Sequence, residues 1–291
     1  MGGPLDALAR GVPEGLQIAV LALAFWITYS ATRVIHLALG AIFVIAPLVM
    51  SLWLQAALST IPGVLISMIA GTLISLGCEV LNHRRLETRR ASWAVHLASS
   101  LGIYVSLVQV AVLVGGNETR QLHQSVSEGL VLGSTVLAQG EVMSVVISVA
   151  VIAGTALWLR SSNLALRLRA LGDNSRELSI QGLNTNALRC WAFGISGLLC
   201  AAGSLTRGFD VGTDPQKGLV SLMPAMVAVF VGKDLGFAGV IFVGIALGVV
   251  RSTVVLVASA QWQEAVTFGV LMIFLLTRSQ IALGTSRAAS R

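Results

Sequence analysis

Long apolar runs separated by short polar stretches dominate the pattern of hydrophobic and polar positions along this chain. A helix needs about 20 residues to cross a bilayer, and backbone groups in lipid must pair within their own segment, so such runs predict membrane-crossing α-helices. The candidate spans cover roughly residues 15–31, 34–58, 61–82, 92–115, 129–159, 187–206, 218–232, 236–258 and 262–277. The expected fold is all-α: one polytopic membrane domain over residues 1–291, with about eight or nine transmembrane helices.

The fifth run, residues 129–159, is too long for one upright helix. Two arrangements fit its length: one tilted span, or a short membrane-embedded helix followed by a complete one. The polar trio Gln139-Gly140-Glu141 marks the place where the run would divide. This ambiguity leaves the expected number of spans open.

Composition supports a membrane protein, since 55% of the 291 residues are hydrophobic and only 11% are charged. Soluble domains carry about 25% charged residues, which cover their water-facing surface. The net charge of +6 does not indicate nucleic-acid binding, because the charges stand in short loops between apolar runs. Cys78, Cys190 and Cys200 lie singly, without CxxC spacing, so neither a disulfide nor a metal site is expected.

Arginine sets the expected orientation. Arginine-rich stretches at residues 82–90, 160–189 and 278–291 should be cytoplasmic by the positive-inside rule, which places the C-terminus in the cytoplasm. Residues 115–128 and 206–217 mix both signs and are expected outside. The N-terminus would lie outside with nine spans and inside with eight.

The central polar stretch, residues 161–186, interrupts the apolar pattern and defines a short helix. Gly172 lowers helix propensity, and Asn174 with Glu177 three residues later resembles a capping box. Gly182 stands where a left-handed residue would end the helix. We expect about two helical turns at the cytoplasmic membrane surface, serving either as a partner site or as an interfacial anchor. Two well-defined ends favour the partner site.

The sequence RALGDNSRELSIQGLNTNALRCWAFGISGLLCAAGSL closely resembles the cytoplasmic coupling segment of permeases from bacterial branched-chain amino acid ABC transporters. That family commonly has Arg-Ala, Asp-Asn and Gly-Ile-Asn where this chain has Arg169-Ala170, Asp173-Asn174 and Gly182-Leu183-Asn184. The opening segment GLQIAVLALAFWITYSATRVIHLALGAIF and the closing segment QWQEAVTFGVLMIFLLTRSQIALG are similar to the family's first pair of spans and its last span. The resemblance therefore covers nearly the whole chain.

The resemblance implies a permease subunit in the bacterial cytoplasmic membrane whose short helix docks on an ATPase and passes its motion to the spans. The coupling residues it implies are Asp173, Asn174, Glu177, Leu178 and Gly182. It also implies a second permease subunit, similar or identical, and a soluble substrate-binding protein. The segment GKDLGFAG lacks the first glycine and the Ser/Thr of a phosphate loop. No catalytic residue or cofactor is thus expected in this chain, and ATP and Mg²⁺ would belong to the ATPase.

Candidates for the solute path in the second run are His36 and Gln55, because polar groups within spans commonly serve function, and Gly40, where the helix could break or pack closely. The family's usual Asn-Leu-Ala-His-Gly is replaced here by His36-Leu37-Ala38-Leu39-Gly40. A hydrogen-bonded structural role for His36 is equally compatible with the sequence. The departure leaves the cargo open between a branched-chain-type amino acid and a sugar, nucleoside, urea or amide moved by the same machine.

Several other charged residues need an explanation. Arg207, Asp210 and Asp214 form either a solvated outer turn or, as the resemblance implies, a docking surface for the substrate-binding protein. Arg251 lies deep in the eighth run and needs a partner, for which Glu264 is a candidate. A protein of another class, an ion-coupled secondary carrier, would need a titrating buried acid, and the best candidate for it is Glu141.

Two further predictions concern packing. Glu79 is expected to pair with Arg84 or with the membrane interface, and His96 is expected to join helices. Gly244 and Gly248 form a small-xxx-small pair, for which close packing within the chain is favoured over a dimer face.

Overall fold

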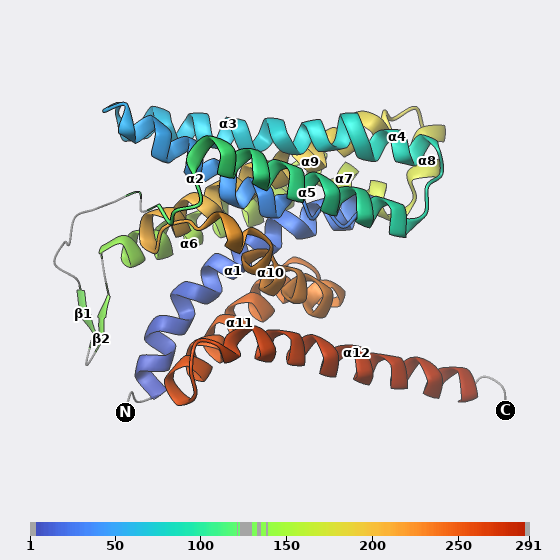
Figure 1. The fold of residues 1–291 in the computed structure, drawn as a ribbon. Coiled ribbons are helices and arrows are strands. Elements are labelled where there is room, and N and C mark those ends of the chain that lie inside the picture. Colours follow the sequence, from blue (N-terminus) through green and yellow to red (C-terminus); the bar gives the residue numbers. More distant parts are fainter. Residues whose placement is uncertain (1–3, 121, 123–129, 133–134, 138, 289–291) are drawn as a thin grey trace.

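The computed structural model describes the whole chain except residues 1–3, 121, 123–129, 133–134, 138 and 289–291. It is almost entirely helical (Figure 1). The α-helices are α1 (Pro4–Thr32), α2 (Leu39–Gln55), α3 (Thr60–Cys78), α4 (Arg84–Thr88), α5 (Trp93–Gly115), α6 (Gln139–Ser161), α7 (Asn163–Asp173), α8 (Ser175–Ile180), α9 (Thr185–Asp210), α10 (Gly218–Gly232), α11 (Gly236–Val257) and α12 (Trp262–Ala288). The π-helix η1 (Glu79–His83) joins α3 to α4, and the 3₁₀ turns η2 (Pro215–Lys217) and η3 (Lys233–Leu235) flank α10.

Six helical stretches within the described residues are long and apolar enough to cross a membrane. They are Ala7–Thr32, Thr60–Thr88, Trp93–Gly115, Gly140–Ser161, Thr185–Asp210 and Pro215–Val257. Two shorter apolar helices, Leu39–Gln55 and Trp262–Phe274, accompany them. The prediction of an all-α polytopic protein therefore fits the structure, whereas a count of eight or nine spans is not confirmed.

The prediction for residues 129–159 was wrong in its first third. A β-hairpin of β1 (Leu130–Leu132) and β2 (Thr135–Leu137) occupies that part, and α6 begins only at Gln139. The strands contain Val131, Val136 and Thr135, whose β-branched side chains favour extended backbone, and a Gly-Ser pair separates them in the sequence. Hydrophobicity alone could not distinguish this hairpin from a helix.

The second predicted span, 34–58, is also shorter than expected, because α2 begins at Leu39. Arg33 has a positive φ of 58° and ends α1. The Thr32 hydroxyl donates to the Thr28 carbonyl at 2.8 Å and accepts from the Val34 amide at 3.3 Å. These local bonds replace the helical pattern at the break. His36 consequently lies in a non-helical link rather than inside a span.

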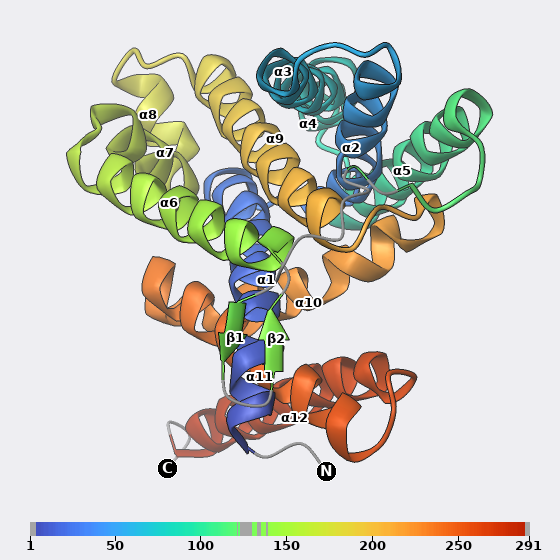
Figure 2. The same ribbon diagram turned by 90° about the vertical axis from the view of Figure 1, so that its left-hand side faces the viewer.

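Helices α1 and α9 form the centre of the molecule. In the most apolar part of α1, 83% of the residues are buried, and in that of α9, 78% are. The corresponding share is 28% or less in Thr60–Thr88, Trp93–Gly115 and Gly140–Ser161. Figure 2 shows α1 passing through the middle, with α6, α9, α10 and α11 around it. The exposed apolar faces of α3, α5 and α6 are those expected of helices that face lipid.

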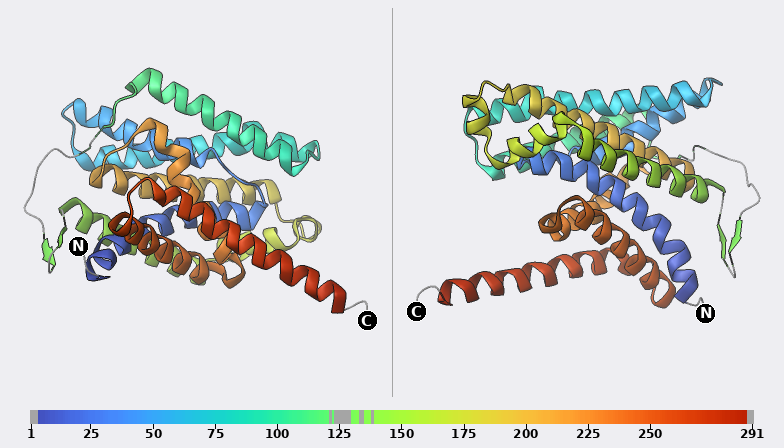
Figure 3. Two further views of the ribbon diagram at one scale, coloured as in Figure 1. Left: turned by 60° about the horizontal axis from the view of Figure 1, so that its bottom comes forward. Right: turned by 180° about the vertical axis from the view of Figure 1, so that it is seen from behind.

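The two ends of the molecule differ. The hairpin and the start of α1 lie at one end, and α7 and α8 lie at the other (Figure 1). Helix α12 runs along the outside towards the end that carries α8, as the two further views in Figure 3 also show. We call the end with α8 the coupling end and the opposite end the hairpin end.

Small residues bring helices into backbone contact, as the pairs α1/α11 and α3/α9 show. In the pair α1/α11, a Cβ added to Gly15 would lie 2.7 Å from the Ile245 Cα, and one added to Gly244 would lie 3.0 Å from the Ala19 Cα. In the pair α3/α9, a Cβ on Gly197 would lie 2.6 Å from the carbonyl oxygen of Gly71. The predicted packing of Gly244 and Gly248 within the chain is thus confirmed, since both meet α1.

The π-helix η1 extends the buried face of α3 towards the coupling end. This face repeats every fourth residue: Gly63, Ser67, Gly71, Ser75, Glu79 and His83 are all buried. In an α-helix such a stripe drifts by about 40° per step, because a turn contains 3.6 residues. The wider π-turn offsets part of that drift. It therefore keeps Glu79 and His83 facing the interior.

Candidate translocation pocket and coupling segment

The coupling segment contains two short helices that the sequence caps at defined positions. The side-chain oxygen of Asn174 accepts from the amides of Arg176 and Glu177, both at 3.2 Å, and starts α8. Gly182 follows α8 with a φ of +81°, the left-handed geometry predicted for it. Asn184 then accepts from the Ala187 amide at 3.1 Å and caps α9. The expected short helix, with its caps, is confirmed.

The coupling segment is anchored to the body by an apolar cluster. Leu168, Leu171 and Leu178 are buried together with Ala31 of α1 and Leu188 of α9. By contrast, Glu177 of α8 and the two residues that precede this helix, Asp173 and Asn174, are exposed. The segment therefore has one face fixed to the spans and one charged face directed outward.

Gly172 has a different role from the helix breaker predicted for it. Helix α7 continues through Gly172 to Asp173. A Cβ at this position would overlap the carbonyl oxygen of Ser30 in α1. The glycine thus permits close contact between α7 and the end of α1.

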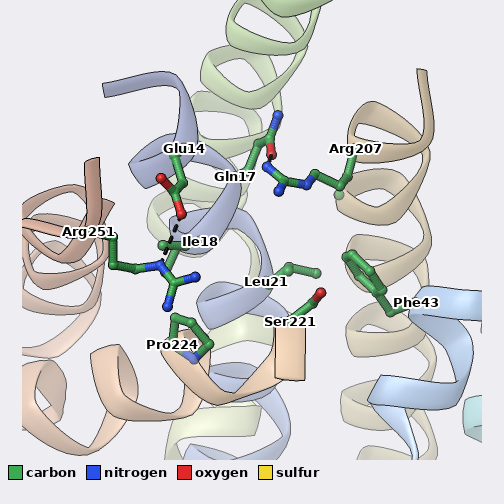
Figure 4. A pocket seen from close by; sticks show the side chains of 10 residues that line it. Glu14, Gln17, Ile18, Leu21, Phe43, Arg207, Ser221, Pro224 and Arg251 are labelled. Carbon is green, nitrogen blue, oxygen red and sulfur yellow. Dashed lines mark hydrogen bonds and ion pairs between the residues drawn. The ribbon is translucent and has the colours of Figure 1, made fainter. Parts of the chain in front are cut away.

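A polar pocket lies between helices, and residues near the start of α1 and near the end of α9 are among those that line it (Figure 4). Its cavity volume is about 60 Å³. The lining residues come from five helices: Glu14, Gln17, Ile18 and Leu21 of α1, Phe43 of α2, Gly203 and Arg207 of α9, Ser221 and Pro224 of α10, and Arg251 of α11. The pocket therefore lies between the close-packed pair α1/α11 and the C-terminal part of α9, and beside it Gly203 of α9 packs directly on Val20 of α1.

One side of the pocket is a complete ion-pair network around Arg251. Its Nε donates to Glu14 at 2.9 Å, Nη2 to Glu264 at 3.1 Å and Nη1 to the Thr267 hydroxyl at 2.7 Å. The predicted partner Glu264 is confirmed, and Glu14 is a second carboxylate that the sequence did not reveal. The network joins α1, α11 and α12, so the guanidinium stabilises that side of the pocket instead of standing unpaired in lipid.

The opposite side carries a hydrogen-bond chain centred on Gln17. Its Nε2 donates to the Asp210 carboxylate at 3.1 Å and to the Ser144 hydroxyl at 3.2 Å. Its Oε1 accepts from Arg207 Nη1 at 3.0 Å. Among the described residues, no carboxylate lies within ion-pair distance of the Arg207 guanidinium. Arg207 thus has donors available to a polar solute in the pocket.

Arg207 and Asp210 do not lie in an outer loop, as the sequence analysis predicted, because α9 continues to Asp210. Asp214 does lie in the turn that follows. It caps η2 through the Gln216 amide at 2.9 Å and lies 3.7 Å from Lys217. Arg207 therefore contributes to the pocket, whereas Asp214 stays at the surface between α9 and α10.

The residues predicted for the solute path do not meet in this pocket. His36 is fully buried, 3.2 Å from the Ser75 hydroxyl and beside the Phe193 ring. Gly40 packs against Tyr104, where an added Cβ would lie 3.0 Å from the ring. Gln55 is exposed at the end of α2. None of the three is among the pocket-lining residues.

Glu79 pairs with Arg189 of α9, not with Arg84 as predicted. Arg189 Nε and Nη2 donate to the two Glu79 oxygens at 2.6 and 3.3 Å, and Nη1 lies 3.6 Å from Glu87. We call Arg189, Glu79 and Glu87 the Arg189 clamp. Removing one partner of such a buried pair costs about 3–5 kcal/mol. Sequence reasoning missed it because the partners stand 110 residues apart.

The Arg189 clamp borders a second cavity of about 530 Å³ at the coupling end. Arg189 and Glu87 line it together with Asp173, Asn174 and the end of α1. His96 also lines it and lies 3.3 Å from His83, nitrogen to nitrogen, so it does join α5 to the η1 turn. The coupling segment, the clamp and this cavity are therefore neighbours.

Comparison with known proteins gives a consistent result. The chain is 22% identical to the high-affinity branched-chain amino acid transport system permease protein BraD of Pseudomonas aeruginosa, over 96% of this chain and 95% of that one. The permease protein LivH of Escherichia coli K12 is also 22% identical, over the same shares. The ribose import permease protein RbsC of Haemophilus influenzae is 29% identical over 42% of this chain and 36% of its own.

A solved structure, PsaBC from Streptococcus pneumoniae in complex with Fab, shares the fold. Its TM-score is 0.52 at 12% sequence identity, and the match covers 92% of this chain and 90% of that one. The family described as "Branched-chain amino acid transport system / permease component" matches residues 8–276. The helices, the capped coupling segment and this match together show that the chain belongs to the family of branched-chain amino acid transport permeases.

Proposed function

We propose that this chain is the membrane subunit of an ATP-driven importer in the bacterial cytoplasmic membrane. The single observation that carries the proposal is α8, a helix capped by Asn174 and Gly182 whose charged face is exposed at one end of the molecule. An ATPase would dock on the face formed by Asp173, Asn174 and Glu177, while Leu178 ties α8 to the spans. ATP and Mg²⁺ would be bound by that ATPase.

The proposed orientation follows from the same helix. If α8 contacts an ATPase, the coupling end is cytoplasmic, and so is the end of α12, which lies on that side (Figure 1). The hairpin end would then face the substrate-binding protein, with Asp214 in the surface it meets. A second permease, similar or identical, would complete the membrane part and cover apolar surface of this chain.

The cargo we propose is a small polar solute of the branched-chain amino acid type, the class that appears in the names of the relatives BraD and LivH. The pocket between α1/α11 and α9 is the place we propose for its passage, because Arg207 and Gln17 offer hydrogen bonds there. His36, Gly40 and Gln55 are not proposed as contacts in it. The partial match to a ribose permease keeps a neutral sugar as the second candidate.

The experiment that tests this function is co-purification from the native host in mild detergent, with mass spectrometry of the bound proteins. Gly182→Ala forces a non-glycine residue into the left-handed region, which costs about 1–2 kcal/mol. Gly116→Ala is the control for backbone strain away from α8: Gly116 has a φ of +82° and a ψ of 176°, a region that glycine almost alone adopts, it has open space around it, and it follows α5 near the hairpin end.

An ATPase recovered with the wild type and with Gly116→Ala, but reduced with folded Gly182→Ala, is the expected result. No ATPase with the folded wild type would contradict the importer and favour an ion-coupled carrier, for which Glu141 would be the first residue to test. Equal recovery with both variants would mean that α8 is not the docking element.

A further inference from the structure

Arg189 lies where the coupling segment, α9 and the α3–η1–α4 helix meet. It is the fifth residue of α9 and only 8% exposed, and Glu79 is 0% exposed. The two-pronged contact at 2.6 and 3.3 Å holds the guanidinium in one orientation relative to η1. A replacement of this pair by apolar side chains would keep the burial but lose that directional contact.

The link from α8 to α9 is short and held by hydrogen bonds. Gln181 N donates to the Glu177 carbonyl at 3.0 Å, and Leu183 N donates to the Leu178 carbonyl at 3.1 Å. Asn184 then caps α9 directly. Hydrogen bonds therefore bind the residues between the two helices, and a displacement of α8 reaches the first turn of α9.

Helix α9 is attached to the α3–η1–α4 helix at three points. The glycine contact between Gly197 and Gly71 and the hydrogen bond from the Ser75 hydroxyl to the Phe193 carbonyl, at 2.7 Å, join α9 to α3. The Arg189 clamp lies nearest α8, about 12 Å along α9 from Gly197, and joins the first turns of α9 to η1 and α4. Without the clamp these first turns lose their ion pairs to η1 and α4, so a displacement of α8 can move them without moving the α3–η1–α4 helix.

The far end of α9 reaches the translocation pocket. Arg207 lies near the C-terminal end of α9 and is hydrogen-bonded to Gln17 of α1. Helix α1 in turn is packed on α11 through its own glycine contacts. Helix α9 also packs directly on α1, since a Cβ on Gly203 would lie 3.0 Å from the Val20 side chain. The pocket is thus bordered by the pair α1/α11 and by the C-terminal part of α9, and movement of that part of α9 relative to α1 changes its shape.

We propose that the Arg189 clamp is the transmission element that makes α3 and α9 move together when α8 is displaced, and so opens or closes the pocket at Arg207. This inference rests on the proposed function. Arg189 is a positioning residue in it, because its contacts are with Glu79 and Glu87 and it does not line the pocket. Breaking the clamp would leave the ATPase bound but disconnect its motion from the pocket.

The test measures one distance across the pocket end of the assembled transporter in lipid nanodiscs. Spin labels at Leu8→Cys and Val211→Cys report on α1 and on the end of α9; both residues are exposed, and Cys78, Cys190 and Cys200 are first replaced by serine. The distance is recorded by pulsed electron paramagnetic resonance without nucleotide and with a non-hydrolysable ATP analogue and Mg²⁺. No cargo is needed.

Arg189→Gln is expected to abolish most of the nucleotide-induced shift while ATPase recovery stays at the wild-type level. Arg85→Gln, an exposed arginine of α4, is the matched control and should keep the full shift. Arg189→Lys keeps the charge near Glu79 but loses the forked contact, so a reduced shift is expected. Exchange of the pair, Arg189→Glu with Glu79→Arg, should restore part of the shift, because the ion pair can form again with its charges reversed.

A full shift in folded Arg189→Gln would overturn the inference. If Arg189→Gln does not fold, the Arg189→Lys variant replaces it in the test. A full nucleotide-induced shift in folded Arg189→Lys would also overturn the inference. Failure of the wild type to bind an ATPase at all is a separate outcome, because it rejects the proposed function before the clamp is tested.

Discussion

Gly15 of α1 lies against α11 without room for a methyl group. A Cβ there would be 2.7 Å from both the Cα and the carbonyl oxygen of Ile245, whereas ordinary van der Waals contact begins at 3.4 Å. Gly15→Ala should therefore push the two backbones apart by about 0.7 Å, since close-packed interiors leave no space to absorb the overlap. Because Glu14 is its neighbour, the 2.9 Å bond from Arg251 to Glu14 would lengthen to about 3.6 Å, beyond hydrogen-bond range.

The expected cost of Gly15→Ala is about 1–3 kcal/mol, the usual range for overpacking a tight contact. Gly154→Ala is the matched control, because Gly154 is exposed on α6 and has nothing within 4 Å of an added Cβ. Alanine is favoured over glycine inside a helix by up to about 1 kcal/mol, so the control should be neutral or more stable. The two glycine-to-alanine changes are therefore predicted to act with opposite sign.

The assay is thermal unfolding in detergent, followed by size-exclusion chromatography of the protein that stays folded. Gly15→Ala should lose its folded peak at a lower temperature than the wild type, and Gly154→Ala should not. Equal stability of the two variants would show that α1 and α11 do not approach as closely as the structure has them. The pocket between α1/α11 and α9 would then lack the rigid side inferred for it.

Three other predictions follow from the same contacts. Asn174→Ala removes the side-chain acceptor that starts α8, so it should cost about 1 kcal/mol and lower ATPase recovery; unchanged recovery would contradict the cap's importance. Arg251→Gln leaves Glu14 and Glu264 without their cation and should destabilise the protein by about 3 kcal/mol in the thermal assay; a stability equal to wild type would refute the network. Arg207→Gln removes the donors that border the pocket and should raise the half-saturating concentration for L-leucine uptake with ATPase recovery unchanged; an unaltered uptake curve would argue against Arg207 as a cargo contact.

The sequence by itself determined the class of the fold and the coupling helix, because both depend on local rules. Apolar runs select membrane helices wherever they occur, and the caps at Asn174 and Gly182 act on residues only two to five positions away. The same local reading failed at residues 130–137, where an apolar run contains enough β-branched residues to form a hairpin. It also placed Arg207 in a loop, although Gly212, which follows the Val211 C-cap with a φ of +88°, marks the end of α9 beyond Arg207.

Only the tertiary structure decided which distant residues meet. Arg189 and Glu79 stand 110 positions apart, and Arg207 and Gln17 stand 190 apart, so no periodicity or spacing relates them. The first pair exists where Gly71 and Gly197 let α3 and α9 approach at the backbone, and the second exists where Gly203 lets α9 pack closely on Val20 of α1. Helix contacts in a membrane depend on close packing and interhelical polar bonds rather than on hydrophobicity, which every span shares. The clamp and the pocket are therefore properties of the assembled helices, whereas the spans and the coupling helix are properties of the chain.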